Sequence, residues 1–498
     1  MRTIVLGALL VVAVGCSGSV SGSGGGSASG GGAAVGGGAA VGGGAAVGGG
    51  AAVGGGAAVG GGAATGGGAA AGGGAATGGG AATGGGGAAT GGGAATGGGA
   101  ATGGGAATGG GAATGGGAAT GGGAATGGGA GGGGAGPTQW VLGYYVGYMI
   151  NDYPIAQIDW SGLTHIAFAP MVVKSNLTLD LTFDDSNGTG QQDAMALATA
   201  AHAHGVKALL MLGGAGAGPN IATASNTTNR AAFVSTLVST MNTLGYDGID
   251  LDWEDSVNLD DLVSLAQDLR TAQPSIVLTY PGGPINGNFQ SVDSRFVALA
   301  AALDQFNVQT YYPATAFAGQ GWDSWFSSPI SGVSGSTPIA IDDTLQRYNQ
   351  AGIPKAKLGF GMAFYAICYT GGITGPRQST NGSSQQITGG DNDYPLSAFF
   401  ASGSTFDGAA AANLMRDSTA QVPYLTFSNP VNDAHCGGNT QYINYEDETS
   451  IIAKGTWSKA NGYGGMIIWT IQEGWLPPNA SGGRAQNALM QALKNGFL

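Results

Sequence analysis

Short apolar runs alternate with amphipathic stretches along residues 137–498. The apolar runs have the length and the branched or aromatic side chains typical of buried strands. They cover residues 140–147, 163–170, 206–212, 247–253, 276–281, 306–311, 358–365 and 464–470. Apolar residues recur at helical spacing between them, in residues 191–204, 230–244, 259–271, 294–303, 342–350, 449–460 and 484–494. Strands and helices in this alternation predict an α/β fold, the (β/α)8 barrel, over residues 137–498.

An insert interrupts the alternation after the seventh predicted strand, over about residues 369–445. It is rich in Gly, Ser, Thr and Asn, and its apolar residues keep no regular period. Such composition favours loops over helices or strands. We therefore expect an elaborated loop with some structure.

A glycine-rich repeat precedes the predicted barrel. Of the 498 residues 104 are Gly, and most of these lie in residues 24–136, which repeat GGGAAV and then GGGAAT. A collagen helix needs Gly at every third position, which this repeat does not supply. The repeat carries no charge and no large apolar residue beyond a few Val, so it cannot bury a core. We interpret residues 17–136 as a disordered linker, with a packed glycine-rich fold as the alternative.

The first 16 residues are typical of an export signal. An apolar run from Ile4 to Val14 follows Arg2 and is too short to span a bilayer. It ends at Gly15-Cys16, and small residues before a Cys resemble a bacterial lipoprotein box, in which Cys16 would be lipidated. The alternative is an ordinary secretory signal with an incidental Cys. We expect export, with a lipid anchor at the bacterial cell surface or outer membrane, or else secretion.

Charge limits the partners that the protein can have. Only 9% of residues are charged and the formal net charge is −13, all of it outside the uncharged repeat. An acidic domain disfavours nucleic acid and suits an uncharged substrate. We expect a monomer without a cofactor, which meets a membrane only through the lipid anchor.

Two further cysteines, Cys368 and Cys436, flank a low-complexity stretch. Cysteines of an exported protein often pair, because the compartment is oxidising. The sequence leaves open whether these two form a disulfide.

Four carboxylates lie in the fourth predicted strand: Asp247, Asp250, Asp252 and Glu254. Because strand side chains alternate, the last three point to one face of the strand. Like charges at this spacing cannot all ionise freely, so at least one of these acids should have a raised pKa. Glu254 is then a proton donor at neutral pH. Carboxylates on alternate residues can also bind Ca²⁺ or Mg²⁺, but one strand supplies a single line of ligands, so we expect no metal.

The pattern D-G-x-D-x-D-x-E over residues 247–254 resembles the signature of glycoside hydrolase family 18, the chitinases and their relatives. The resemblance implies that Glu254 protonates the glycosidic oxygen. It implies that Asp252 turns between its neighbours and the N-acetyl group of the substrate. Asp250 would hold and tune Asp252, and Asp247 would be structural.

Other segments are similar to motifs of the same family. Tyr144, in the first strand, matches a Tyr that contacts the inner acid. Leu212-Gly213-Gly214 resembles the end of the third-strand motif, which gives Gly213 and Gly214 structural roles. Tyr311, in Gln309-Thr310-Tyr311, matches a Tyr that contacts the N-acetyl carbonyl, and Trp469 matches the floor of the central sugar subsite. The substrate-binding candidates are Trp469, Tyr144, Tyr145, Gln309, Tyr312 and Trp253. Trp322 and Trp325, which we expect to be exposed on a Gly- and Ser-rich loop, could extend an aromatic cleft for sugar faces.

Three positions depart from the family pattern. Met211 stands where the family has the Ser that partners the inner acid. Tyr312 stands where the family has Asp or Asn, and the Gly-Arg that often follows Phe364-Tyr365 is missing. These departures concern the placement of the substrate more than acid catalysis.

The resemblance implies hydrolysis of β-1,4-linked N-acetylglucosamine polymers by substrate-assisted, retaining catalysis. Two other enzymatic functions fit the same acids, an endo-β-N-acetylglucosaminidase acting on glycoproteins and a peptidoglycan hydrolase. A glycan-binding lectin on the same barrel is the non-catalytic alternative. Such lectins usually lack the terminal Glu, which is present here as Glu254.

Overall fold

The computed structural model describes residues 139–498 except 286–290, 312–321, 381–386, 390, 392, 402, 406–412 and 479–483. The predictions for Cys16, for the linker of residues 17–136 and for Tyr312 lie outside the described residues. Within the described ranges, no helix is both long and apolar enough to cross a membrane.

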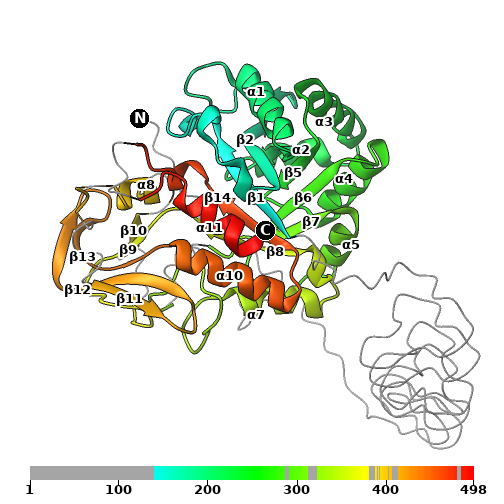
Figure 1. Ribbon diagram of the computed structural model, residues 1–498. Helices are drawn as coiled ribbons and strands as arrows, with labels where there is room; N and C mark the ends of the chain where they lie inside the picture. Colours follow the sequence, from blue (N-terminus) through cyan, green and yellow to red (C-terminus); the bar gives the residue numbers. More distant parts are fainter. Residues whose placement is uncertain are drawn as a thin grey trace, which may run out of the picture. The chain divides into compact units, whose positions relative to one another are not determined.

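A closed parallel barrel forms the centre of the domain (Figure 1). Neighbouring strands pair in parallel, and β1 pairs with both β2 and β14, which closes the barrel. The short β3 (Leu179–Asp180) adds to the end of β2 in antiparallel orientation. The prediction of a (β/α)8 barrel is confirmed. Its strands are β1 (Trp140–Val146), β2 (His165–Val173), β4 (Lys207–Gly213), β5 (Gly248–Asp252), β6 (Val277–Gly282), β7 (Gln305–Val308), β8 (Leu358–Ala363) and β14 (Gly465–Trp469).

Helices follow the barrel strands and bury one face each. Local signals fix several of their ends. Asn258 begins α4 by accepting hydrogen bonds from the amides of Asp260 and Asp261. Gly245 ends α3 in the left-handed conformation that glycine adopts most readily. The helices are α1 (Gly190–Ala203), α2 (Gly218–Ser225), α3 (Arg230–Leu244), α4 (Leu259–Ala272), α5 (Arg295–Ala302), α7 (Ile341–Gln350), α10 (Glu448–Asn461) and α11 (Ala488–Phe497).

Strand alternation divides the apolar side chains into two layers. On β5, Ile249, Leu251 and the following Trp253 pack in the large cluster that includes the helices. Tyr144 and Met211 belong instead to a smaller cluster formed by alternate residues of β1, β2, β4 and β14. We identify this smaller cluster with the barrel interior, because it holds the strand faces that turn away from the helices.

A hydrogen-bonded chain of polar side chains fills the N-terminal end of the barrel. The indole of Trp140 donates to Asn307 (2.8 Å), and the Asn307 amide donates to Gln305 (3.2 Å). Gln305 reaches Nε2 of His165 at 3.2 Å, and Nδ1 of His165 lies 2.7 Å from the hydroxyl of Thr164. Burial lowers the pKa of His165 to about 4, so the imidazole is neutral at pH 7.

The insert is more regular than the sequence suggested. Its strands form an antiparallel sheet in the order β10-β9-β13-β12-β11. The expectation of a loop with only some structure was wrong, because β13 buries the polar Thr440 and Asn444, which breaks the alternation of apolar and polar residues that marks a strand. The strands are β9 (Ile367–Tyr369), β10 (Ile387–Gly389), β11 (Leu414–Asp417), β12 (Val422–Asp433) and β13 (Gly437–Asn444), and a short helix α8 (Leu396–Phe399) lies between β10 and β11.

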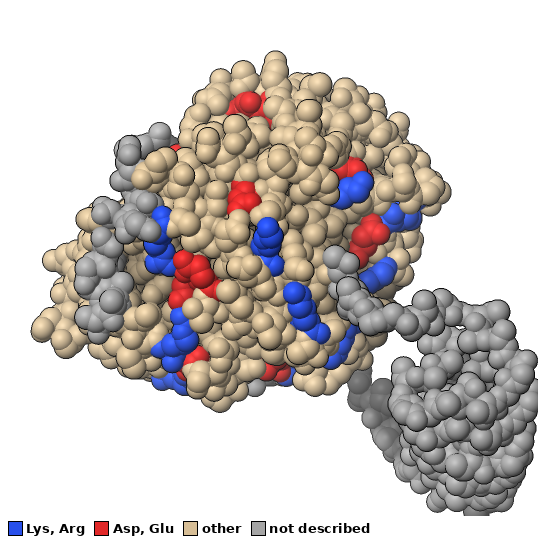
Figure 2. Space-filling view, in the orientation of Figure 1, with Lys and Arg blue, Asp and Glu red and all other residues tan. Residues whose placement is uncertain are grey.

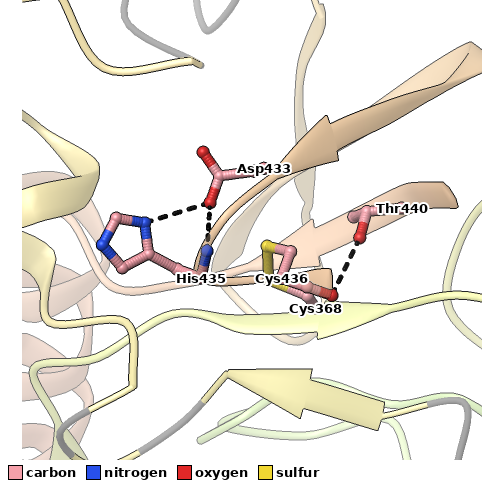
Figure 3. The surroundings of a disulfide bond; sticks show 5 residues. All are labelled: Cys368, Asp433, His435, Cys436 and Thr440. Carbon is pink, nitrogen blue, oxygen red and sulfur yellow. Dashed lines mark hydrogen bonds and ion pairs between the residues drawn. A yellow bond between two sulfur atoms is a disulfide. The ribbon is translucent and has the colours of Figure 1, made fainter. Parts of the chain in front are cut away.

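A disulfide joins Cys368 on β9 to Cys436 in the turn between β12 and β13 (Figure 3). Both cysteines are buried. Thr440 donates to the Cys436 carbonyl at 3.4 Å, and the neighbouring His435 lies 3.1 Å from Asp433. The pairing that the sequence left open is therefore present, and it ties the hairpin to the strand that leaves the barrel.

Charged side chains are sparse on the face shown in Figure 2. Lys and Arg lie scattered there among uncharged residues and near Asp and Glu. Among the described residues, ion pairs such as Arg230–Asp268 (2.9 Å) also bring the two signs together. This face therefore carries no extended field of one sign.

Candidate active site

Residues from three strands meet where the barrel strands end. Glu254 follows the end of β5, and Gln309 and Tyr311 follow the end of β7. Trp469 is the last residue of β14. Because parallel strands end at the same side of a barrel, these side chains share one mouth, which is where barrel enzymes carry their chemistry.

Asp250 is the innermost of the three acids and is fully buried. Its Oδ2 accepts a 2.8 Å hydrogen bond from the hydroxyl of Tyr144, and its Oδ1 accepts one from the hydroxyl of Thr279. Burial raises the pKa of Asp250 to about 6; the two hydroxyls oppose this rise and the charge of Glu254 adds to it. Asp250 is thus held firmly by two neutral donors.

Asp252, the middle acid, is 3% exposed, and its Oδ1 has no hydrogen-bond partner among the described residues. Burial raises its pKa well above the usual range, and the charges of Glu254 and Asp250 raise it further. Asp252 therefore binds a proton more readily than an exposed carboxyl does, and its Oδ1 has no partner among the described residues.

Two glycines allow β4 to pass close behind Asp252. The amide of Gly214 donates a 2.8 Å hydrogen bond to the Asp252 carbonyl. Gly213 has φ +117°, and a side chain there would overlap that same carbonyl. The structural roles predicted for Gly213 and Gly214 fit this close approach.

Glu254 is half-buried at the mouth of the barrel. The amide of Gln309 donates a 2.6 Å hydrogen bond to its Oε1. Burial raises the pKa of Glu254, the Gln309 hydrogen bond lowers it, and the nearby Asp255 raises it. A partly exposed carboxyl with a raised pKa can donate a proton to a group bound in the mouth.

Three acids in a row lie at the mouth of a parallel barrel, and the sequence of this barrel matches a known family. The family model described as Glycosyl hydrolases family 18 matches residues 141–474. The chain belongs to glycosyl hydrolases family 18. It is a chitinase-like glycoside hydrolase.

Similar proteins carry related names. A chitinase-like effector of Moniliophthora perniciosa is 24% identical over 403 residues, which cover 71% of this chain and 86% of that protein. A probable endochitinase of Caenorhabditis elegans is 26% identical over 297 residues, 53% of this chain and 43% of that protein. The crystal structure of Ostrinia furnacalis Group IV chitinase in complex with allosamidin shares the fold, with TM-score 0.57, 18% identity, and coverage of 71% of this chain and 97% of that one.

Aromatic side chains line the same mouth in this family 18 enzyme. The rings of Tyr144 and Trp469 lie 5.2 Å apart, and Trp469 and Tyr311 are each partly exposed. Burial raises the pKa of Tyr311, and the charges of Glu254 and Asp252 raise it further, so its hydroxyl stays a neutral donor. Tyr311 and Trp469 thus add partly exposed aromatic surface beside the acids.

Two predicted substrate contacts are wrong. Tyr145 points away from Tyr144, is fully buried and donates a 2.6 Å hydrogen bond to the Tyr153 carbonyl. Trp253 is 2% exposed, and its indole donates to the Asp255 carbonyl at 2.9 Å. Strand alternation turns both rings into the outer layer, away from the acids.

The structure also places three other residues that the sequence analysis named, Trp325, Trp322 and Asp247. Trp325, which we expected on an exposed loop, is fully buried and donates a 2.7 Å hydrogen bond to the Ile339 carbonyl, so it is a core residue. Trp322 is half-buried. Asp247 lies at the opposite end of β5 from Glu254, where it accepts a 2.9 Å hydrogen bond from the Ala208 amide, which fits the structural role predicted for it.

Two residues near the acids were missed by the sequence analysis. Thr279 on β6 binds Asp250, but a hydroxyl inside an apolar strand gives no pattern that marks it. Asp391, from the insert, accepts a hydrogen bond from the indole of Trp469. Its position in a Gly- and Asn-rich stretch looked like loop sequence. In the described residues, no group of three or more His, Cys, Asp or Glu is arranged to hold a metal ion.

Proposed function

We propose that this enzyme hydrolyses β-1,4-linked N-acetylglucosamine polymers, chitin or chitooligosaccharides, with net retention at the anomeric carbon. The observation that carries the proposal is the state of Asp252. It is buried between two acids, its pKa is raised well above the usual range by burial and by their charges, and it has an oxygen without a partner among the described residues. An acetamide group beside Asp252 would satisfy that oxygen.

The proposed reaction has two steps. Glu254 donates its proton to the glycosidic oxygen while the acetamide oxygen of the same sugar attacks the anomeric carbon and the bond to the leaving sugar breaks. Asp252 and the Tyr311 hydroxyl orient the acetamide and stabilise the positive charge of the ring that forms. Water, deprotonated by Glu254, then adds to the anomeric carbon, reopens the ring and restores the proton on Glu254.

The test is product analysis on chitooligosaccharides, a high-mannose glycopeptide and peptidoglycan, with fully deacetylated chitosan as the matched control. The proposal predicts release of N-acetylated oligosaccharides from the first substrate and no cleavage of chitosan, which lacks the attacking acetamide. Cleavage confined to the glycopeptide or to peptidoglycan would favour those alternatives. Efficient cleavage of chitosan would contradict the substrate-assisted mechanism.

We further propose that Cys16 carries a lipid anchor and that residues 17–136 act as a linker between the anchor and the barrel. The small residues before Cys16 and the uncharged repeat after it support this arrangement. A flexible chain of about 120 residues has an r.m.s. span of roughly 55–65 Å, enough to carry the domain away from a surface. Cys16→Ser should then move the protein from the detergent phase to the aqueous phase, and unchanged partitioning would contradict the anchor.

We also propose that the enzyme acts as a monomer, since a single barrel contributes all the site residues. Light scattering of purified protein should give the mass of one chain. A dimer mass would contradict this.

A further inference from the structure

Asp250 is enclosed by the two strands that flank β5. In the parallel registers, Met211 on β4 and Thr279 on β6 lie directly opposite it. All three residues are at most 1% exposed. The surroundings of the Asp250 carboxyl are therefore set by these neighbours rather than by bulk water.

Of the two flanking strands, only β6 supplies a hydrogen-bond donor to this carboxyl. Met211 offers a thioether, which has no hydrogen to donate. Thr279 offers a hydroxyl, which donates to Oδ1 of Asp250. With the Tyr144 hydroxyl on Oδ2, both oxygens are satisfied by neutral donors.

The other ionisable groups around Asp250 work against its ionisation. Asp252 and Glu254 lie on the same face of β5, and each carries or can carry a negative charge. Tyr311, from the end of β7, is neutral, and its own pKa is raised in part by Asp250. A buried carboxylate without donors is costly, so the hydroxyls of Thr279 and Tyr144 are what allow Asp250 to ionise.

We propose that Thr279 is a positioning residue for the reaction: from β6 it holds Oδ1 of Asp250 and keeps this acid ionised beneath Asp252, a task for which β4 supplies no donor. This inference rests on the proposed function of the same site. It assigns a role to a residue outside the acidic motif.

Thr279 affects the reaction through the pKa of Asp252. The charge of Asp250 is one of the causes that raise the pKa of Asp252, so an ionised Asp250 helps Asp252 keep its proton. Loss of the Thr279 hydroxyl would raise the pKa of Asp250 above about 6. Asp250 would then become protonated at a higher pH than in the wild type. The acid limb of the pH–activity profile would therefore move to higher pH.

The experiment compares Thr279→Val with Thr279→Ser. The valine variant should lose about 10- to 100-fold in kcat near pH 6, the range for one lost hydrogen bond to a charged group, and its acid limb should move to higher pH. KM should change little, because Thr279 is fully buried and does not meet the substrate. The serine variant keeps the hydroxyl and should restore both rate and profile.

A second variant restores a donor from the opposite strand. In Met211→Ser/Thr279→Val, the new hydroxyl lies beside Asp250 in the β4–β5 register and should recover part of the lost rate. Thr344→Val is the matched control. Thr344 is also fully buried, but its hydroxyl accepts from the Ile285 amide (2.7 Å), so the variant should lose stability without a shift of the pH profile.

The inference fails if Thr279→Val keeps the wild-type pH profile, or if it loses activity equally at every pH and Thr279→Ser does not restore it. A titration of ¹³C-labelled aspartate carboxyls without substrate measures the Asp250 carboxyl directly. It therefore distinguishes failure of this inference from failure of the proposed function. If wild-type protein did not cleave chitooligosaccharides, the proposed function would be wrong. The upward shift of the Asp250 titration in Thr279→Val would still test the hydrogen bond itself.

Discussion

The side-chain amide of Gln309 donates a 2.6 Å hydrogen bond to Oε1 of Glu254 and so joins the end of β7 to the acid that follows β5. A donor to a carboxylate stabilises its ionised form. Gln309 therefore opposes the burial that raises the pKa of Glu254. The strength of the proton donor at the mouth is set by the balance of these two effects.

Gln309→Leu should move the alkaline limb of the pH–kcat/KM profile to higher pH. The substitution removes a hydrogen bond that lowers the pKa of Glu254, so the proton stays on Glu254 to a higher pH. A pH series on a chromogenic chitooligosaccharide measures the shift, with the exposed Gln346→Leu as the control. A limb that stayed in place or moved to lower pH would contradict the assignment of Glu254 as the proton donor.

His165 should make the barrel sensitive to acid. Its pKa is lowered to about 4 in the folded state, chiefly by burial, whereas an unfolded His titrates near its ordinary value of 6.5. As pH falls from about 6.5 to about 4, the unfolded chain binds a proton that the folded chain does not, so the free energy of unfolding decreases. The measurement is urea unfolding of wild type and His165→Gln at pH 7 and pH 4.5. The variant should lose less stability between pH 7 and pH 4.5 than the wild type does. Equal losses would exclude His165 as a source of the acid sensitivity.

The Cys368–Cys436 disulfide should stabilise the insert without taking part in the chemistry. It closes a loop with a sequence separation of 68 residues, and removing a bridge of this kind costs about 2–5 kcal/mol. The double variant Cys368→Ala/Cys436→Ala should have a lower Tm than wild type, and dithiothreitol should lower the Tm of wild type only. The kcat on soluble oligosaccharides at 25 °C should be close to that of wild type. A large loss of kcat with an unchanged Tm would contradict this account.

The sequence predicted the barrel and the three acids because both follow simple periods. Apolar runs marked the strands, and alternation placed Asp250, Asp252 and Glu254 on one face. The same alternation turns Trp253 to the other face, away from the acids, and its prediction as a substrate contact did not take this into account. Thr279 could not be found this way, because its role depends on the register between β5 and β6, and register is a property of the folded sheet. The insert sheet was missed because β13 buries the polar Thr440 and Asn444, so its sequence lacks the usual apolar face of a strand.

The central claim is that Glu254 donates the proton that cleaves a bond between N-acetylglucosamine units. Glu254→Gln keeps the shape of the side chain and its place beside Gln309 but has no acidic proton. The direct measurement is the rate of product release from N-acetylchitotetraose by wild type and by this variant, with binding of the oligosaccharide measured in parallel. We predict that kcat falls by about 10²–10⁴-fold or more while binding is retained. Product release by Glu254→Gln at a near wild-type rate would contradict the account.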